Sequence, residues 1–269
     1  MPTIISASRR TDLPGFHAAW LADRLGQLRR PPAALFLWTK HPAALVRPGA
    51  LREALAALPN VLVHLTITGL GGTDLEPSAP AWSAAQAEVP RLIDLLGGDG
   101  RRILWRFDPV IPARASPEIF ARLADGLAAR GVRHCIISFL SSLSLKGSLL
   151  PQYARFGLAP SPMAQKVDWA GRLADRARAA GLELRLCCQP KVVERLGGNG
   201  SPASCIDAQL ASALHPEQPA LAAAKDSTQR KHCRCAPSTD IGDYAAHLCR
   251  TGCAYCYSKA GGPGGSPFS

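Results

Sequence analysis

Residues 61–68 read VLVHLTIT, a run of apolar side chains broken only by one histidine and two threonines. A strand with one face in water alternates apolar and polar residues, whereas this run is apolar on both faces. Such runs are typical of parallel strands that are covered on both sides. Five other segments have the same character: Thr3–Ser8, Ala34–Thr39, Ile103–Phe107, His134–Phe139 and Leu182–Cys187.

Helical patterns separate these segments. Ser116 and Pro117 precede a helix over Glu118–Arg130, and Ser161 and Pro162 precede another over Met163–Ala180, since Ser is a good N-cap and Pro suits the first turn. Further helices are predicted over Phe16–Leu28, Leu51–Leu58 and Ala84–Leu96. A strand and a helix recur about every thirty residues, the length of a βα unit. Residues 1–187 therefore predict an α/β fold, a partial parallel TIM-type barrel of about six βα units.

The composition changes after Cys187. Residues 188–269 are rich in Cys, Gly, Pro and Ser, and only Cys205–Leu214 reads as a helix. The chain ends in GGPGGSPFS, which we expect to be a loose tail. We predict that 188–269 is a cysteine-rich extension packed on the mouth of the barrel.

The overall charge and the cysteine count limit the choice of function. A net charge of +11 indicates an anionic partner, either a small molecule or nucleic acid, although solvated helix faces also carry such charge. No apolar run is long enough to cross a membrane, and no signal peptide is visible. We expect a cytoplasmic protein, in which the nine cysteines bind metal or do redox chemistry rather than form disulfides.

Polar residues stand at the ends of the predicted strands. In parallel barrels these ends form the mouth in which active sites lie. The candidates for catalysis are Arg10, Asp12, Lys40, Arg106 and Asp108, and those for cofactor binding are Thr66, Thr68, Ser138 and Gln189. We expect the five catalytic candidates to face one cavity, where the two arginines would bind carboxylate or phosphate. Two simpler interpretations stay open: Asp12 caps a helix, and Arg106 pairs with Asp108.

The strongest motif lies near the C-terminus, where Cys249, Cys253 and Cys256 are spaced C-x3-C-x2-C. Zinc sites favour two short-spaced pairs, whereas three cysteines on one loop can hold three corners of a [4Fe–4S] cubane and leave the fourth iron open. A structural metal loop is the alternative.

This spacing, with aromatic Tyr255 before the last cysteine, resembles the signature of radical S-adenosylmethionine enzymes. The resemblance implies that the three cysteines hold a [4Fe–4S] cluster, that S-adenosyl-L-methionine chelates its open iron, and that a 5′-deoxyadenosyl radical takes hydrogen from a substrate. In that superfamily the motif usually follows the first strand, whereas here it lies beyond the sixth.

A closer resemblance covers nearly the whole chain. Segments such as IISASRRTDLP at 4–14, WRFDPVI at 105–111 and CRTGCAYCY at 249–257 resemble domain-of-unknown-function family 1848. The name of that family states no activity, so the resemblance implies an architecture more than a function.

The remaining cysteines suggest a second site. Cys135 lies within a predicted strand, and we assign it and Cys188 to the core. Cys187, Cys205, Cys233 and Cys235 would then form a closed site, either a fully ligated cluster or zinc.

Two classes of function follow. The leading hypothesis is a radical S-adenosylmethionine-like enzyme that acts on a small anionic substrate and takes electrons from a donor such as flavodoxin or ferredoxin. The alternative is a binding or electron-transfer module that iron–sulfur or zinc stabilises, with nucleic acid as an open partner.

Overall fold

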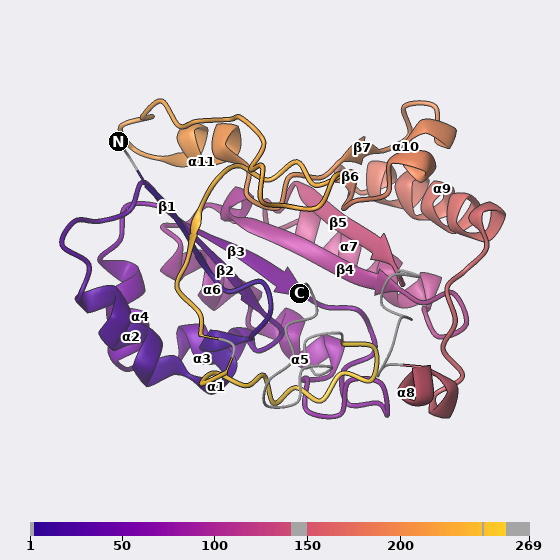
Figure 1. Ribbon diagram of the computed structural model, residues 1–269, viewed down its shortest axis with the longest axis horizontal. Helices are drawn as coiled ribbons and strands as arrows, with labels where there is room; N and C mark the ends of the chain where they lie inside the picture. Colours follow the sequence, from indigo (N-terminus) through magenta and orange to yellow (C-terminus); the bar gives the residue numbers. More distant parts are fainter. Residues whose placement is uncertain (1–2, 141–149, 244, 257–269) are drawn as a thin grey trace.

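The computed structural model describes residues 3–140, 150–243 and 245–256 and consists of one parallel sheet with helices along it (Figure 1). The predicted tail at 261–269 lies outside the described residues. None of the described helices is long and apolar enough to cross a membrane.

The sheet has eight strands in the order β7-β6-β5-β4-β3-β2-β1-β8, and every pair of neighbours is parallel. It is open, because β7 and β8 lie at opposite edges. The parallel α/β prediction is confirmed, and all six predicted strands are present. The strands are β1 Ile4–Ala7, β2 Ala34–Thr39, β3 Val61–Thr66, β4 Ile103–Val110, β5 His134–Phe139, β6 Glu183–Leu186, β7 Ser201–Pro202 and β8 Thr239–Asp240.

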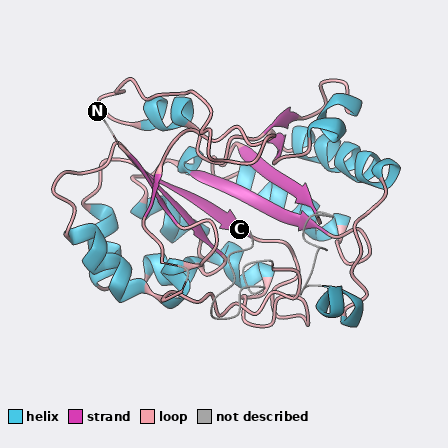
Figure 2. Cartoon of the chain, in the orientation of Figure 1, coloured by secondary structure: helices cyan, strands magenta, loops and turns pink. Residues whose placement is uncertain are grey.

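Helices alternate with the strands along the chain, and Figure 2 shows them lying alongside the sheet. They are α1 Leu13–Phe16, α2 Ala18–Gly26, α3 Pro42–Val46, α4 Ala50–Ala56, α5 Trp82–Ala87, α6 Val89–Leu95, α7 Pro117–Ala128, α8 Leu150–Arg155, α9 Met163–Ala179, α10 Pro190–Arg195 and α11 Ala208–Leu214, with a 3₁₀ turn at Gly100–Arg102.

Some helix predictions were wrong in detail. The helix predicted over Phe16–Leu28 is two helices that meet at His17, and the one over Ala84–Leu96 is also two, since Pro90 sits in the first turn of α6. The extension holds α10 besides the one helix predicted there.

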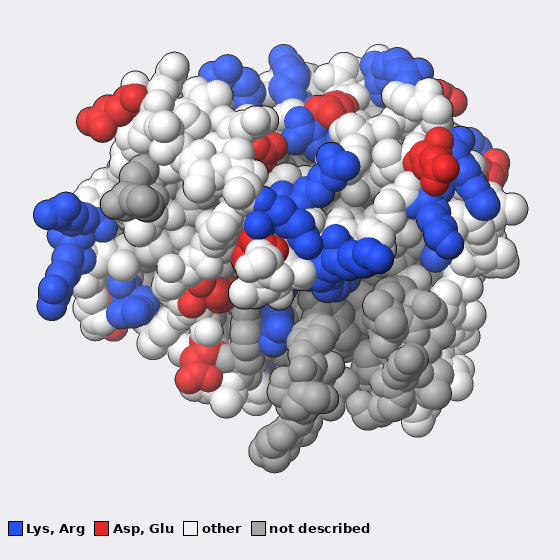
Figure 3. Space-filling model, turned by 45° about the horizontal axis from the view of Figure 1, so that its top comes forward, with Lys and Arg blue, Asp and Glu red and all other residues white. Residues whose placement is uncertain are grey.

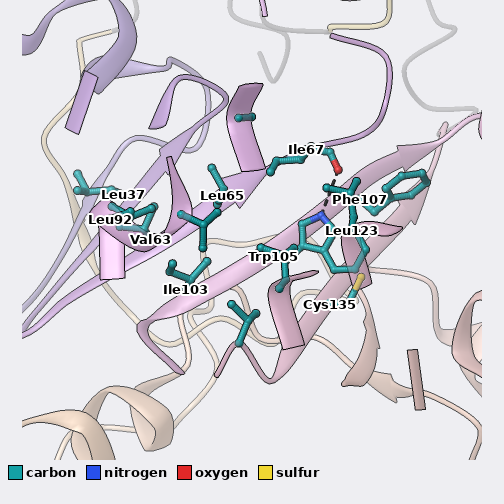
Figure 4. Close-up of a cluster of buried hydrophobic side chains, with 14 of the residues drawn as sticks. Leu37, Val63, Leu65, Ile67, Leu92, Ile103, Trp105, Phe107, Leu123 and Cys135 are labelled. Carbon is teal, nitrogen blue, oxygen red and sulfur yellow. Dashed lines mark hydrogen bonds between the residues drawn. The ribbon is translucent and has the colours of Figure 1, made fainter. Parts of the chain in front are cut away.

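The helix-facing side of the sheet carries the larger core. Alternate strand residues such as Leu65, Trp105 and Phe107 pack there against helix residues such as Leu92 and Leu123 (Figure 4). The indole of Trp105 is fully buried and donates to the carbonyl of Ile67 at 3.1 Å, so its single polar group is satisfied.

The C-terminal extension covers the opposite side of the sheet. Strand residues such as Phe36 and Leu104 pack there against Ala208, Ala211 and Leu214 of α11 and against the chain around 203–206 and 233–236. The extension also supplies both edge strands, β7 and β8. It is thus part of the same sheet, and the inner face that it covers is where polar residues of the strands meet the cysteines.

Gly71 allows a close backbone approach in the loop after β3. A Cβ on this residue would lie 1.9 Å from the carbonyl oxygen of Pro80, which cannot turn aside as a side chain can. Gly71→Ala should lower the free energy of unfolding by about 2–3 kcal/mol, measured by urea denaturation, because overpacking forces the backbone to shift. Gly26→Ala is the control: a Cβ there meets nothing within 4 Å, so it should be neutral or stabilising. Equal destabilisation by both would contradict the expected clash.

Glu183 ties together the amino ends of three strands. Its carboxylate lies 3.4 Å from His134 and 2.7 Å from Arg185, and Ser201 donates to it at 2.6 Å. The contact with His134, helped by Arg185 and Ser201, lowers the pKa of this carboxyl below its ordinary value of 4.5. A depressed pKa stabilises the fold while the carboxylate is charged, and this stabilisation is lost as pH falls below about 4.5.

Glu183→Gln should therefore cost about 1 kcal/mol of unfolding free energy at pH 7, a modest value because Glu183 is partly exposed. The difference from the wild type should shrink as pH falls through 4.5 toward 3. Denaturation curves at several pH values measure this, with the exposed Glu194→Gln on α10 as control. A difference that stays constant with pH would show that the charge of Glu183 contributes nothing.

Candidate metal centre at the carboxyl edge of the sheet

The three-cysteine loop lies against the carboxyl edge of the sheet. Edge strand β8 pairs in parallel with β1, and the chain that leaves it runs along this edge to Cys256 (Figure 1). Thr11, which follows β1, donates to the carbonyl of His247 at 2.8 Å. In the segment after β3, Leu75 accepts from the backbone of Ala254 at 2.9 Å. These contacts hold the loop at the carboxyl edge of the sheet.

A buried carboxylate lies beneath the loop. Glu76 is only 2% exposed, and its Oε1 accepts from Thr68 at 2.6 Å and from Tyr255 at 2.5 Å. Lys40 forms an ion pair with the same oxygen at 3.0 Å. The structure thus joins three predicted site residues through Glu76.

The charges of Lys40 and Glu76 affect the pKa of Cys253. Burial raises the pKa of Cys253 to about 12, against the opposing influence of the positive charge on Lys40. For Lys40, burial alone would lower the pKa, but the charge of Glu76 outweighs it and raises the pKa. Lys40 therefore stays protonated, and Cys253 without a metal stays a thiol. A bound metal would reverse that preference, because a ligating thiol is deprotonated.

Arg106 and Asp108 form a second ion pair at the same edge. Arg106 donates to Asp108, and the hydroxyl of Ser138 donates to the other carboxylate oxygen. Arg106 also donates through Nη1 to the sulfur of Cys205 at 3.1 Å. The pairing interpretation of Arg106 and Asp108 is therefore correct, and the pair also contacts a cysteine.

Asp12 holds two strand ends in place. It caps α1 by accepting from the backbone of Gly15 at 2.9 Å, and its other oxygen accepts from the backbone of Lys40 at 2.7 Å. Burial raises the pKa of Asp12, while His41 and these backbone donors oppose that effect. Asp12 therefore acts as the helix cap that its position before Pro14 also allowed.

Three other candidates are placed only by their backbone. Arg10 follows β1, and its backbone N–H donates to Ser8 Oγ at 3.5 Å. Thr66 ends β3, and Gln189 stands at the N-terminus of α10 without a capping hydrogen bond from its side chain. All three lie at carboxyl ends of strands, as predicted, and Thr66 is the register partner of Arg106 on the neighbouring strand β4.

The other cysteines gather on the inner face. The sulfurs of Cys187 and Cys205 are 3.6 Å apart, and the backbone N–H of Cys235 donates to the sulfur of Cys233 at 3.5 Å. Cys188 is partly buried and packs against the same apolar cluster.

The backbone explains the place of Cys188. Its φ of 53° breaks the alternation of the strand, so that it and Cys187 both pack on the inner face. Cys135 is fully buried on the helix-facing side, as predicted.

The donor sets suit soft metals. Thiolates in clusters select iron–sulfur or zinc, and all nine cysteines are free thiols in this structure. Within the described ranges no three Cys, His, Asp or Glu side chains are arranged to hold one metal ion.

Sequence reasoning missed Glu76. This residue lies in a loop and has no motif around it, although two acids close together in that loop, Asp74 and Glu76, are a weak signal. The assignment of Cys188 to the core assumed that the strand continues through it, whereas β6 ends at Leu186.

Comparisons with known proteins give a family and distant structural likenesses. A model of the family described as Domain of unknown function (DUF1848) matches residues 31–258. No curated protein matches the chain.

The chain is similar to the carboxyl transferase domain of Rhizobium etli pyruvate carboxylase, with 16% identity and a TM-score of 0.31 over 75% of this chain and 39% of that one. For the same domain with pyruvate and biocytin the identity is 14% and the TM-score is 0.32, over 96% of this chain and 46% of that one. The chain thus spans less than half the length of these structures, and TM-scores of this size carry no argument.

Proposed function

Because the chain belongs to the domain-of-unknown-function family DUF1848, whose name states no activity, we propose its function from the site itself: a radical S-adenosylmethionine-like iron–sulfur enzyme that acts on a small anionic substrate. In this proposal Cys249, Cys253 and Cys256 hold a [4Fe–4S] cluster with one open iron. A buried polar cluster lies beside the motif and forms what we call the floor of the site: Glu76 contacts Tyr255, Thr68 and Lys40.

The observation that carries the proposal is the place of the three-cysteine loop. The sequence predicted six strands, and the motif lies beyond the sixth. In the structure the strand that precedes the motif is β8, which pairs in parallel with β1 at the edge of the sheet. The loop thus leaves an outer parallel strand at its carboxyl end. That is the position, relative to the sheet, that a motif after a first strand would have.

The cluster and S-adenosyl-L-methionine, when bound, would supply the one-electron chemistry that removes hydrogen from a substrate. The chain's own residues would bind and orient that substrate. Arg106 uses Nη2 for Asp108 and Nη1 for Cys205, and a guanidinium has five N–H donors, so donors are left for a carboxylate or phosphate. Lys40, held protonated, would add a second positive charge.

The cytoplasm suits such a centre, because clustered thiols stay reduced there. An electron donor such as flavodoxin or ferredoxin would have to approach the loop from solvent. Leu248, beside Cys249, is 61% exposed and is the natural first contact for it.

The alternative is a binding or electron-transfer module that contacts nucleic acid. It is favoured by the excess of basic residues, several of which gather near the middle of the face in Figure 3. The buried polar cluster of Lys40, Glu76 and Tyr255 favours the enzyme, because a structural metal loop has no need of it.

The experiment is release of 5′-deoxyadenosine from S-adenosyl-L-methionine by protein reconstituted anaerobically with iron and sulfide. We expect an oxygen-sensitive brown protein, a change in its electron paramagnetic resonance spectrum on adding S-adenosyl-L-methionine, and product in the presence of a reductant. Stoichiometric zinc without labile sulfide would refute the cluster. A cluster whose spectrum does not change when S-adenosyl-L-methionine is added would be structural or redox, as the alternative expects.

A further inference from the structure

The inner face of the sheet carries a group of five thiols, which we call the ring: Cys187, Cys188, Cys205, Cys233 and Cys235 pack there in one cluster. The separation of 3.6 Å between the sulfurs of Cys187 and Cys205 is close to the edge of a tetrahedron of thiolates with metal–sulfur bonds of about 2.3 Å, which is about 3.8 Å. Segments far apart in sequence thus bring five soft ligands together.

Backbone and side-chain donors point at these sulfurs. The N–H of Ile206 donates to the sulfur of Cys235 at 3.4 Å, and the N–H of Cys235 donates to the sulfur of Cys233 at 3.5 Å. Arg106 donates to Cys205. Donors of this kind surround metal-bound thiolates, because they stabilise the negative charge that several thiolates bring to one centre. A thiol that merely fills a core has no need of them.

The ring lies between the sheet and the extension. Three of the cysteines, Cys205, Cys233 and Cys235, are buried among apolar residues of the sheet and of the extension. The other two, Cys187 and Cys188, are partly buried and pack against this cluster. Residues 215–235 contain no helix or strand, so packing alone gives this stretch little reason to be ordered. A ligand shared by the end of β6, the chain before α11 and the 233–235 turn would order it.

We propose that this ring is a second metal site. Four of its five thiolates bind one soft centre, which is either zinc or an iron–sulfur cluster, and Cys188 is one of the five candidate ligands. The site is separate from the three-cysteine loop and does not depend on any activity there. Among the described residues the sulfurs do not surround the position of a single ion, so binding would pull them inward. The free energy of metal binding would then contribute to folding of the extension.

The test removes the first site and asks what metal remains. In the variant C249S/C253S/C256S, elemental and sulfide analysis should find either about one zinc or an iron–sulfur complement per chain, since each needs four ligands. Adding Cys205→Ser and Cys233→Ser together to this background leaves three thiols in the ring and should lower that metal content at least tenfold, and adding Cys135→Ser, whose thiol lies on the opposite face, should leave it unchanged.

A second measurement covers variants that fold poorly. The wild-type chain, stripped with a chelator and titrated with Co²⁺ alone under anaerobic conditions, should show thiolate-to-cobalt absorption that Cys188→Ser weakens or shifts. Absence of retained metal in the triple-serine variant, together with absence of thiolate–cobalt absorption in the wild type, would overturn the proposal. Loss of S-adenosyl-L-methionine cleavage would not, because that result bears on the three-cysteine loop alone.

Discussion

Cys253→Ala should abolish release of 5′-deoxyadenosine and remove the cluster's spectroscopic signal. Cys253 is the most buried cysteine of the loop, and the positive charge of Lys40 acts on it. With two of three thiolates left, a cubane at this loop would lose a corner and the open iron would no longer be defined. Measurement is by product analysis and electron paramagnetic resonance after anaerobic reconstitution.

The matched control is Cys135→Ala. This cysteine is also buried, but on the helix-facing side of the sheet, so its removal should cost about 1 kcal/mol of stability and leave product release at the wild-type level. A Cys253→Ala protein that keeps its iron and still releases 5′-deoxyadenosine would show that the loop does not hold the reactive cluster. Loss of product in both variants would indicate a general effect on folding.

The sheet could be predicted from sequence because its strands are covered on both sides. Runs such as VLVHLTIT leave no alternation, and each of the six runs became a strand in chain order. Strand ends shifted by a few residues: β3 ends at Thr66, and β4 continues to Val110 through a change of register. Edge strands β7 and β8 have two residues each, too few for a periodic signal.

The position of a site residue could be predicted from sequence where that residue lies on or directly after a strand. It could not be predicted where a loop carries the residue to the site. Lys40 directly follows β2 and Arg106 lies on β4, so the topology of the sheet places both at its carboxyl edge. Glu76 reaches the same edge through a loop whose path depends on Gly71 and Pro80 in close contact. The place of Cys188 depends on one backbone angle that a sequence does not reveal.

Lys40→Met should lower the free energy of unfolding by about 3–5 kcal/mol, the cost of leaving a buried carboxylate without its cation. Lys40 is 14% exposed and Glu76 is 2% exposed, so their charges are poorly solvated, and their contact of 3.0 Å is the only ion pair of Glu76 among the described residues. Thr68 and Tyr255 would still donate to Glu76, but neither carries a positive charge. Urea denaturation of the metal-free reduced protein measures the change.

A double-mutant cycle separates the pair from other effects of the substitution. Glu76→Gln removes the charge and keeps an oxygen that Thr68 and Tyr255 can donate to, so Lys40→Met with Glu76→Gln should recover at least about 1 kcal/mol relative to the sum of the single changes. Arg91→Met breaks an exposed pair with Glu88 and should cost less than about 1 kcal/mol, because exposed pairs are well solvated. If Lys40→Met costs no more than Arg91→Met, water reaches the pair, and the floor beneath the three-cysteine loop is not the dry, charged surface on which the proposed chemistry depends.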